Sequence, residues 1–385
     1  MADNNENKVL NVPHLRFPEF SGEWKMATFG DIAKGFDYGM NAAAKSFDGN
    51  NKYIRITDID EVSSQYLYDD VVSPDGELED RYLVKENDIL LARTGASTGK
   101  SYLYRNSDGK LYFAGFLIRA NIYKHNSYFV FSQLHTLRYK KWISVMSARS
   151  GQPGINSQEY ASFPVYTTSL QEEDKIATFL KLLDERIITQ NKIIEDLKLL
   201  KSAISLNVLH SDTWEQFKIK DIAQIGRGRV ISSIEISQQK NPTYPVYSSQ
   251  TSNDGIMGYL DDYMFEGEYI SWTTDGANAG TVFYRNGKFN CTNVCGLLKL
   301  IKGFDTHFVS LVLAEATKKY VSINLANPKL MNNTMGNIQI CLPKLEEQKR
   351  ISIVFRVLQR LWTVHNSLLT EYIKQKQYLL SQMFI

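Results

Sequence analysis

The chain has 385 residues, of which 43% are apolar and 12% aromatic, and its formal net charge is +2. This length and composition predict a folded protein of two or three domains and are not typical of a disordered chain. No apolar run approaches the ~18 residues that a membrane-spanning helix needs. The first six residues are polar and acidic and lack a signal-peptide stretch, so we expect a cytoplasmic protein.

The small net charge hides a segregated distribution. Residues 58–88 carry eleven acidic and two basic side chains, whereas residues 93–149 carry ten basic and one acidic. Residues 276–336 repeat the excess more weakly, with seven basic and two acidic side chains. A basic face of this kind can bind a polyanion although the whole chain is near neutral, while the alternative is scattered, solvated charge.

The first part of the chain is predicted to be a mainly β module with some helix. Residues 53–57 and 88–92 have strand composition, a turn is expected at 107–109, and a short helix at 128–139. The segment Gly95-Ala-Ser-Thr-Gly-Lys-Ser101 is similar to a phosphate-binding loop but has three residues between its glycines instead of four. It therefore predicts a turn that closes the module and not an ATP site.

A long helix is predicted from residue 170 to 209. Its apolar residues alternate in steps of four and three, which is the 3.5-residue period of a coiled coil. Forty residues would span roughly 60 Å. An exposed seam of this kind cannot stand alone in water, and its simplest partner is a second helix of the same type. The seam consists of Ile176, Leu180, Leu183, Ile187, Gln190, Ile194, Leu197, Lys201, Ile204 and Val208.

The rest of the chain repeats this plan. Strands are expected at 244–247, 269–272 and 280–284, turns at 253–255 and 285–287, and a short helix at 308–319. Cys291 and Cys295 lie four residues apart without a second pair, so we interpret them as structural thiols and not as zinc ligands. A second long helix is predicted from 345 to 384, with the seam Ile351, Phe355, Leu358, Trp362, His365, Leu369, Tyr372, Lys376, Leu379 and Met383.

The duplication is visible residue by residue. Leu170-Gln-Glu-Glu-Asp-Lys-Ile176 returns 175 residues later as Leu345-Glu-Glu-Gln-Lys-Arg-Ile351. The glycine turn returns as Gly276-Ala-Asn-Ala-Gly280, and Lys140-Lys141 returns as Lys318-Lys319. Two similar halves favour a target that also has two halves.

Candidate binding residues combine basic side chains with small polar and amide side chains. Lys, Ser and Thr suit phosphate contacts, and Arg, Asn and Gln pair with base edges in the major groove. Any one of them is also an ordinary surface residue. In the first half the candidates are Arg93, Thr94, Ser97, Thr98, Lys100, Lys140, Lys141, Arg149, Gln152 and Asn156. In the second half they are Arg227, Arg229, Ser249, Gln250, Thr274, Asn278, Lys318, Lys319, Asn327 and Lys329.

No catalytic set emerges from the sequence. The six histidines show no metal-ligand spacing, no Gly-x-Ser-x-Gly elbow occurs, and the paired acidic residues are not repeated between the halves. We therefore predict no catalytic residues and no metal site.

At this point the residues resemble a known family, the DNA-specificity subunit of type I restriction-modification systems. The similarity covers nearly the whole chain and includes residues 12–24, residues 53–59 and, most clearly, Leu345 to Ile351. The first-half copy departs from the motif, with Glu173-Asp174 where Glu-Gln is usual. Each motif is modestly specific, whereas their order in a duplicated chain is highly specific.

The resemblance implies an α+β protein with two mixed α/β target-recognition domains joined by two long antiparallel coiled-coil helices in a pseudo-two-fold arrangement. The expected boundaries are an N-terminal segment (1–20), the first recognition domain (21–160), the first helical spacer (161–211), the second recognition domain (212–337) and the second spacer (338–385). Each domain would read half of an interrupted DNA site, and the helices would act as a ruler.

The resemblance also implies that this subunit is not an enzyme and binds no cofactor of its own. Double-stranded DNA, two modification (methyltransferase) subunits and the restriction (translocase and endonuclease) subunits are the expected partners, and S-adenosylmethionine, ATP and Mg would be bound by those subunits. The expected docking and spacer residues are Ile176, Leu183, Ile187, Leu197, Ile351, Leu358, Trp362 and Tyr372.

Two other classes stay open from the residues alone. The helices could be an oligomerisation scaffold whose modules bind a protein or a glycan, or the chain could be a nuclease or methyltransferase by itself. The basic segments argue against the scaffold, and the lack of a recognisable metal or cofactor site argues against the enzyme.

Overall fold

A computed structural model describes residues 10–148, 154–209, 211, 213–322 and 327–385 of the chain. The chain forms two compact units, each made from one β-rich module and parts of both long helices. Unit 1 contains residues 1–192 and 367–385, and unit 2 contains residues 193–366. We call residues 21–160 module 1 and residues 212–337 module 2.

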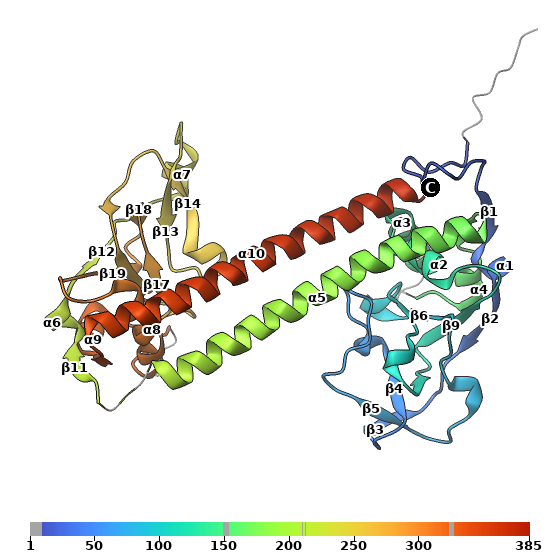
Figure 1. Cartoon of the computed structure of the whole chain (residues 1–385), viewed down its shortest axis with the longest axis horizontal. Coiled ribbons are helices and arrows are strands. Elements are labelled where there is room, and N and C mark those ends of the chain that lie inside the picture. The colour runs from blue at the N-terminus through green and yellow to red at the C-terminus, as the bar shows by residue number, and fades with distance from the viewer. Residues whose placement is uncertain (1–9, 149–153, 210, 212, 323–326) are drawn as a thin grey trace, which may run out of the picture. The chain divides into compact units, whose positions relative to one another are not determined.

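Unit 1 is built around a four-stranded antiparallel sheet with the order β2-β9-β6-β7. Strands β2, β9 and β6 of this sheet are labelled in Figure 1. Three two-stranded pairs, β1-β10, β3-β5 and β4-β8, accompany this sheet, and β4-β8 is parallel. The elements are β1 Lys25–Thr28, α1 Phe29–Ile32, β2 Ala33–Tyr38, β3 Ala43–Ser46, β4 Lys52–Ile54, η1 Ile56–Asp58, β5 Val72–Asp75, η2 Asp80–Tyr82, β6 Asp88–Ala92, η3 Gly95–Ser97, β7 Ser101–Leu103, η4 Asn106–Asp108, β8 Leu111–Phe113, β9 Leu117–Ile122, α2 Ser127–Gln133, α3 Leu137–Ser147, α4 Ser157–Ala161 and β10 Pro164–Thr167.

Unit 2 repeats the four-stranded sheet as β12-β19-β16-β17 and adds a second sheet, β14-β13-β18-β15. A short pair, β11-β20, corresponds to β1-β10 of unit 1. The elements are β11 Glu215–Lys218, α6 Ile219–Ile222, β12 Ala223–Arg227, α7 Ser233–Ser237, β13 Tyr244–Tyr247, η5 Ser252–Gly255, β14 Ile256–Leu260, β15 Phe265–Glu266, β16 Tyr269–Thr273, β17 Val282–Arg285, β18 Lys288–Cys291, β19 Cys295–Leu300, α8 Thr306–Ala316, η6 Thr317–Lys319, α9 Asn332–Asn337 and β20 Gln339–Leu342.

Most strands predicted from composition are confirmed, and two predictions need correction. The segment 53–57 is strand only as far as Ile54, because Asp58 accepts a hydrogen bond from the backbone N–H of Arg55 and turns the chain into η1. The predicted helix 128–139 is in fact two helices, since the hydroxyl of Thr136 accepts from the N–H of Tyr139 and starts a new helix there. Lys140 and Lys141 therefore lie inside α3 and not after a helix.

Both long helices are confirmed, as α5 (Leu170–Val208) and α10 (Leu345–Met383), each of 39 residues. In unit 1, Ile176 and Leu180 near the start of α5 share a core with Leu380 and Met383 near the end of α10. In unit 2 the opposite ends meet, and Ile204 and Val208 of α5 pack with Ile351 and Phe355 of α10. The helices are therefore antiparallel in both units.

The polar interruptions of the seam have different roles. Lys376 of α10 forms an ion pair with Asp184 of α5 at 2.6 Å, and both side chains are largely buried. Lys201 is exposed, and its Nζ lies 3.4 Å from the side-chain oxygen of Gln359. The seam thus tolerates a lysine either because an acid neutralises it or because it reaches solvent.

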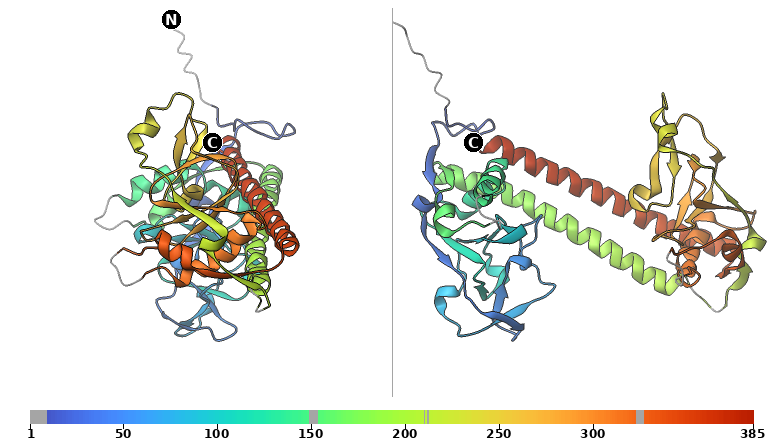
Figure 2. Two further views of the ribbon diagram at one scale, coloured as in Figure 1. Left: turned by 90° about the vertical axis from the view of Figure 1, so that its left-hand side faces the viewer. Right: turned by 180° about the vertical axis from the view of Figure 1, so that it is seen from behind.

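The N-terminal segment of unit 1 lies along the start of α5 and the end of α10 (Figure 2). Arg16 pairs with the buried carboxylate of Glu172 at 2.7 Å, and the N–H of Leu15 donates to the carbonyl of Gln382 at 2.8 Å. The ring of Trp24, 1% exposed, packs edge-on against Phe384. These contacts join the beginning and the end of the chain in one core.

Cys291 and Cys295 are buried free thiols. Burial raises the pKa of Cys295 to about 11, and the Cys295 sulfur donates to the carbonyl of Ser248, which fits a structural role. None of the helices in the described part of the chain combines the length and apolar character that a bilayer crossing requires.

Candidate nucleic-acid interface

The glycine turn of module 1 is fixed between strand β6 and helix α3. The N–H of Gly99 donates to the carbonyl of Ala92 at 3.0 Å, and its own carbonyl accepts from the hydroxyl of Tyr139 at 3.1 Å. A side chain at Gly99, whose φ is +93°, would meet Ile143 of α3 at 2.9 Å. The turn needs glycine here because of both its backbone conformation and this close approach.

Module 2 repeats these contacts with different side chains. The N–H of Gly280 donates to the carbonyl of Thr273 at 2.8 Å, and the hydroxyl of Thr317 donates to the carbonyl of Gly280 at 2.8 Å. A side chain at Gly280 would meet Val321 at 2.6 Å. The glycine turn therefore packs on the lysine-bearing segment in both modules. Lys318 and Lys319, however, lie in the 3₁₀ turn η6 and not in a helix.

The first-half candidates gather at one edge of module 1. Arg93 and Thr94 directly follow β6. The segment from Gly154 to Ile155 lies beside them, because the N–H of Ile155 donates to the carbonyl of Arg93 at 2.9 Å and the backbones of Thr94 and Gly154 form a β-bridge. Asn156 follows directly and caps α4. Ser97, Thr98 and Lys100 belong to the adjoining turn, and Lys140 and Lys141 are exposed on α3. Arg149 and Gln152 lie outside the described residues.

Two of these candidates already have structural roles. Lys100 is bound to Glu61 at 2.9 Å, which neutralises its charge. The side chain of Asn156 accepts from the N–H of Glu159 in a capping box. They are weaker candidates for DNA contact than Arg93, Lys140 and Lys141, for which no acidic partner occurs among the described residues.

Nine of the ten second-half candidates divide into three groups, and Thr274 stands apart. The first group lies exposed around the second glycine turn, where the backbones of Lys329 and Asp275 form an isolated β-bridge; its members are Asn278, Lys318, Lys319, Asn327 and Lys329. Lys318 also pairs with Glu315 at 2.7 Å.

The second group lies on and after β12. The Nε of Arg227 donates to Asn332 at 2.9 Å, and Arg229 is ion-paired with Glu235.

The third group is the loop after β13, which contains Ser249 and Gln250. This loop ends in three left-handed residues, Asn253, Asp254 and Gly255. Gln250 is partly used internally, because its amide donates to the carbonyl of Ile256.

Thr274 does not fit the prediction. It is 1% exposed, and its hydroxyl donates to the carbonyl of Val294 at 3.0 Å. Its place corresponds to Arg93 of module 1, because its carbonyl accepts from the N–H of Leu330 as that of Arg93 accepts from Ile155. A buried, satisfied hydroxyl cannot reach a ligand without breaking this turn.

Three residues that the sequence did not single out lie beside Arg93. Tyr38, Arg55 and Phe116 border a hollow of about 640 Å³ together with Arg93. Phe116 is 57% exposed and Tyr38 43% exposed, which is unusual for large aromatic side chains in adjoining strands and turns. No sequence period marks them, since they come together only through the pairing of β2 with β9 and the turn between β8 and β9.

Glu173 in the first copy of the repeated motif and Gln348 in the second show what the motif does at the start of each long helix. The Glu173 side chain, 0% exposed, accepts from the N–H of Asn126, the N-cap residue of α2, at 2.9 Å. In unit 2, Gln348 accepts from the N–H of Asp305, the N-cap residue of α8, at 3.0 Å. The motif thus fastens α5 to α2 in unit 1 and α10 to α8 in unit 2.

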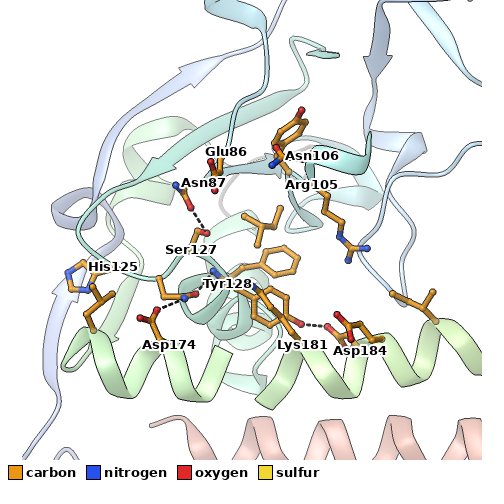
Figure 3. Close-up of a pocket in the computed structure, with 17 residues that line it drawn as sticks. Glu86, Asn87, Arg105, Asn106, His125, Ser127, Tyr128, Asp174, Lys181 and Asp184 are labelled. Carbon is orange, nitrogen blue, oxygen red and sulfur yellow. Dashed lines mark hydrogen bonds between the residues drawn. The ribbon is translucent and has the colours of Figure 1, made fainter. Parts of the chain in front are cut away.

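A polar hollow of about 600 Å³ lies between module 1 and α5 (Figure 3). Two of its four acidic side chains are bound internally, since Asp174 accepts from Asn126 at 2.7 Å and Asp184 from the hydroxyl of Tyr128. None of the predicted DNA-binding residues lines it. We interpret it as part of the junction between module and helix.

The predicted docking and spacer residues lie on the inner side of the helices. Ile176, Leu183, Ile187, Ile351 and Leu358 are at most 9% exposed. Because these five side chains are buried, they hold the helices and modules together. They are not exposed to a partner subunit, which corrects the docking role predicted for them. Leu197, Trp362 and Tyr372 are half-buried.

Exposed apolar side chains lie instead at positions that directly precede the buried residues of the seam. In unit 1 these are Phe179 (40% exposed) and Leu182 (55%). In unit 2 they are Val354 (45%) and Val357 (52%), each 175 residues later, followed by Leu361 and Val364. We call these two sets the outer stripes.

Among the described residues, His, Cys, Asp and Glu side chains form no group of three or more that could hold a metal ion.

Comparison with known proteins agrees with this architecture. The sequence model of a family described as the type I restriction modification DNA specificity domain matches the chain twice, over residues 21–199 and 211–374. A putative type I specificity subunit of Mycoplasma pneumoniae is 37% identical over 205 residues, which cover 52% of this chain and 85% of the relative. Another from the same organism is 38% identical over 216 residues, covering 54% of this chain and 84% of the relative.

The fold is also similar to a solved structure. A type I restriction-modification S subunit from M. genitalium superposes with a TM-score of 0.72, at 15% sequence identity, over 97% of this chain and 99% of the other. With two matches of the family model and a whole-chain fold match, the chain belongs to the type I restriction-modification DNA specificity family.

Proposed function

We propose that module 1 and module 2 each read one half of an interrupted double-stranded DNA site. The observation that carries this proposal is the double match to the DNA specificity family, one match on each module. The exposed lysines that border the glycine turn in both modules support it, because each module needs cations at corresponding places to contact the phosphates of its half-site. As a specificity subunit the chain is not itself an enzyme, and methyl transfer and cleavage belong to its partner subunits.

The two half-sites differ in sequence under this proposal. The modules share their framework but differ in the residues placed on it, as Thr274 in the place of Arg93 illustrates. The predicted DNA-binding residues, apart from Thr274, remain our candidates for these contacts. The proposed domain boundaries stay at residues 20–21, 160–161, 211–212 and 337–338.

The long helices are proposed to set the spacing of the half-sites. A helix of 39 residues is roughly 58 Å long, which exceeds the ~34 Å of one turn of duplex. Insertion of one heptad into both helices, beside Gln190 in α5 and beside His365 in α10, adds about 10 Å, or about three base pairs. We expect the unspecified spacer to lengthen while both half-site sequences stay the same, and an unchanged spacer would refute the ruler.

The outer stripes are proposed as docking surfaces for two modification subunits. Phe179 and Leu182 correspond to Val354 and Val357 through the duplication, so one kind of partner can bind both units in the same way. Exposed apolar residues at heptad spacing favour packing against helices of the partner. Restriction subunits would then join the complex of this chain with its modification subunits.

Docking is tested by the subunit stoichiometry. Leu182→Lys and Val357→Lys should each remove one modification subunit, so that native mass spectrometry shows one copy where the unaltered chain binds two. Leu199→Lys is the matched control, because Leu199 is 69% exposed on α5 but its counterpart in the duplication is the polar Lys374. Two bound copies in both altered complexes would refute the outer stripes as the docking surface.

The proposed function is tested by the adenine-methylation pattern of the host genome with and without this gene. Loss of a two-part motif with a fixed spacer would support the specificity role and give both half-sites. The scaffold alternative, in which the modules bind a protein or a glycan, predicts no such loss, and DNA binding with a steep salt dependence would exclude it. A cytoplasmic location remains part of the proposal.

A further inference from the structure

We propose that the hollow of module 1 bordered by Tyr38, Arg93 and Phe116 reads a guanine of its half-site, with Arg93 as the residue that determines this base. The inference rests on the proposed function and names the base and the residue. A guanine presents two acceptors, N7 and O6, in the major groove, and an arginine pairs with both at once.

Arg93 is available for such a contact, in contrast to the second arginine of the same hollow. Arg55 is held by Asp58 at 2.7 Å and by Asp70 at 3.0 Å, so its charge is neutralised. Among the described residues Arg93 has no ion-pair partner, and its buried Nε has no hydrogen-bond partner there either. The Arg93 side chain as a whole is partly exposed and lines the hollow, so an acceptor of a ligand can meet the remainder of its guanidinium.

The surroundings of Arg93 fix it in place. Its guanidinium carbon lies 4.9 Å from the centre of the Tyr38 ring, and the hydroxyl of Tyr38 accepts from the N–H of Ser157 at 3.2 Å. Its backbone N–H donates to the carbonyl of Phe116 at 3.1 Å, and its carbonyl accepts from Ile155. A cation stacked on a ring and held at both ends of its backbone loses little conformational entropy on binding.

Phe116 gives the hollow an apolar rim suited to a base. It stands 57% exposed in a turn that is itself rigid, since the N–H of Gly115 donates to Met40 at 2.8 Å and that of Leu117 to Ala114 at 2.8 Å. An aromatic ring fixed in this way can contact the face of a base or the methyl group of an adjacent thymine.

Module 2 keeps the framework and changes the three side chains. Arg227 takes the place of Tyr38 on the strand, since each is followed by a glycine in the same surroundings. Gly39 closely approaches the carbonyl of Ala114, and Gly228 that of Cys291. Thr274 replaces Arg93 and Val294 replaces Phe116, as the corresponding backbone hydrogen bonds show. The same backbone thus carries different side chains at these three places, which fits two half-sites of unlike sequence.

The test compares Arg93→Lys and Arg93→Ala in the complete complex with the modification subunit. The recognition motif is obtained from genome methylation, and affinities for duplexes that vary one base at a time are measured by competition. Both variants should relax one guanine position of one half-site, lowering discrimination against the other bases roughly 10- to 100-fold, while the second half-site is unchanged. Lys141→Ala is the control and should weaken binding to all sequences alike, with a smaller salt slope.

The outcomes separate this inference from the proposed function. If Arg93→Lys keeps the full motif and Arg93→Ala merely weakens binding to every sequence, Arg93 contacts phosphate and the inference is wrong while the proposed function stands. If the unaltered complex produces no two-part methylation motif, both are wrong. Because lysine keeps the charge and the aliphatic stem, Arg93→Lys remains informative even where Arg93→Ala fails to assemble.

Discussion

Exchange of Glu173 and Gln348 between the two units is the sharpest test of how the repeated motif works. Both side chains are buried, 0% and 2% exposed, and both accept from the backbone N–H of a helix N-cap residue. Their other partners differ. Gln348 donates its amide N–H to the carbonyl of Pro343 at 2.8 Å, whereas Glu173 accepts from the N–H of Thr168 at 3.2 Å and from His125 at 2.8 Å.

The physical reason lies in residues 168 and 343, which correspond through the duplication. Proline has no N–H, so the side chain facing Pro343 must donate to its carbonyl, which the amide of glutamine does and an ionised carboxylate cannot. Thr168 has an N–H, so the residue facing it must accept, which suits a carboxyl group. The departure of the first-half copy from the usual motif is therefore matched by its surroundings.

Gln348→Glu should place a carboxylate against the carbonyl oxygen of Pro343. We expect the lost hydrogen bond and the buried charge to cost about 3 kcal/mol at pH 7. At pH 5 a protonated glutamic acid can donate to Pro343, so part of this cost should disappear. Glu173→Gln should cost about 2 kcal/mol, because its amide N–H would face a backbone donor, and acid should bring no relief.

The assay is hydrogen exchange of the peptide that contains Asp305 and the start of α8, measured against the unaltered chain at both pH values. A loss of 3 kcal/mol corresponds to roughly a 100-fold loss of protection where the peptide exchanges through opening of this unit. Glu347→Gln is the matched control, since Glu347 is the exposed neighbour of Gln348. If Gln348→Glu is as mild as this control, or equally costly at pH 5 and pH 7, the donor–acceptor argument is refuted.

Three further predictions concern stability. Burial, with Lys376 nearby, lowers the pKa of His135 from 6.5 to about 4, so the stability that its neutral form provides is complete above pH 6.5 and lost as the pH falls towards 4. Unfolding in urea should show a decrease of up to about 3 kcal/mol over this range, flattened in His135→Asn, which can still donate to the carbonyl of Phe131. Leu180→Ala should destabilise unit 1 by about 3 kcal/mol, because Leu180 is 0% exposed, while Leu182→Ala, at 55% exposed, should change the free energy of unfolding by less than about 0.5 kcal/mol; equal effects would contradict the assigned seam. Gly228→Ala should prevent module 2 from folding normally, since its methyl group would lie 1.8 Å from the carbonyl oxygen of Cys291, and an unchanged thermal melting temperature would exclude this close approach.

The sequence by itself determined the architecture. The 3.5-residue period fixes two helices that must pair, because nothing else buries a seam of that length, and the repeated motifs fix two similar modules. The predicted strands 88–92, 244–247 and 269–272 are confirmed, since continuous apolar and β-branched runs in these segments have few other ways to be buried. The alignment of Lys140-Lys141 with Lys318-Lys319 also holds in space, because each pair borders its glycine turn.

Only the tertiary structure decided which candidate residues are available. Thr274 and Lys100 looked as suitable as Arg93 in the sequence, but one hydroxyl is bound to Val294 and one ammonium to Glu61. The hollow with Tyr38 and Phe116 joins side chains almost 80 residues apart through strand pairing, so no local pattern announces it. Periodicity reports which face of an element is buried, whereas the partner of a polar side chain depends on long-range contacts, and for this reason the fold was readable from the chain and the binding residues were not.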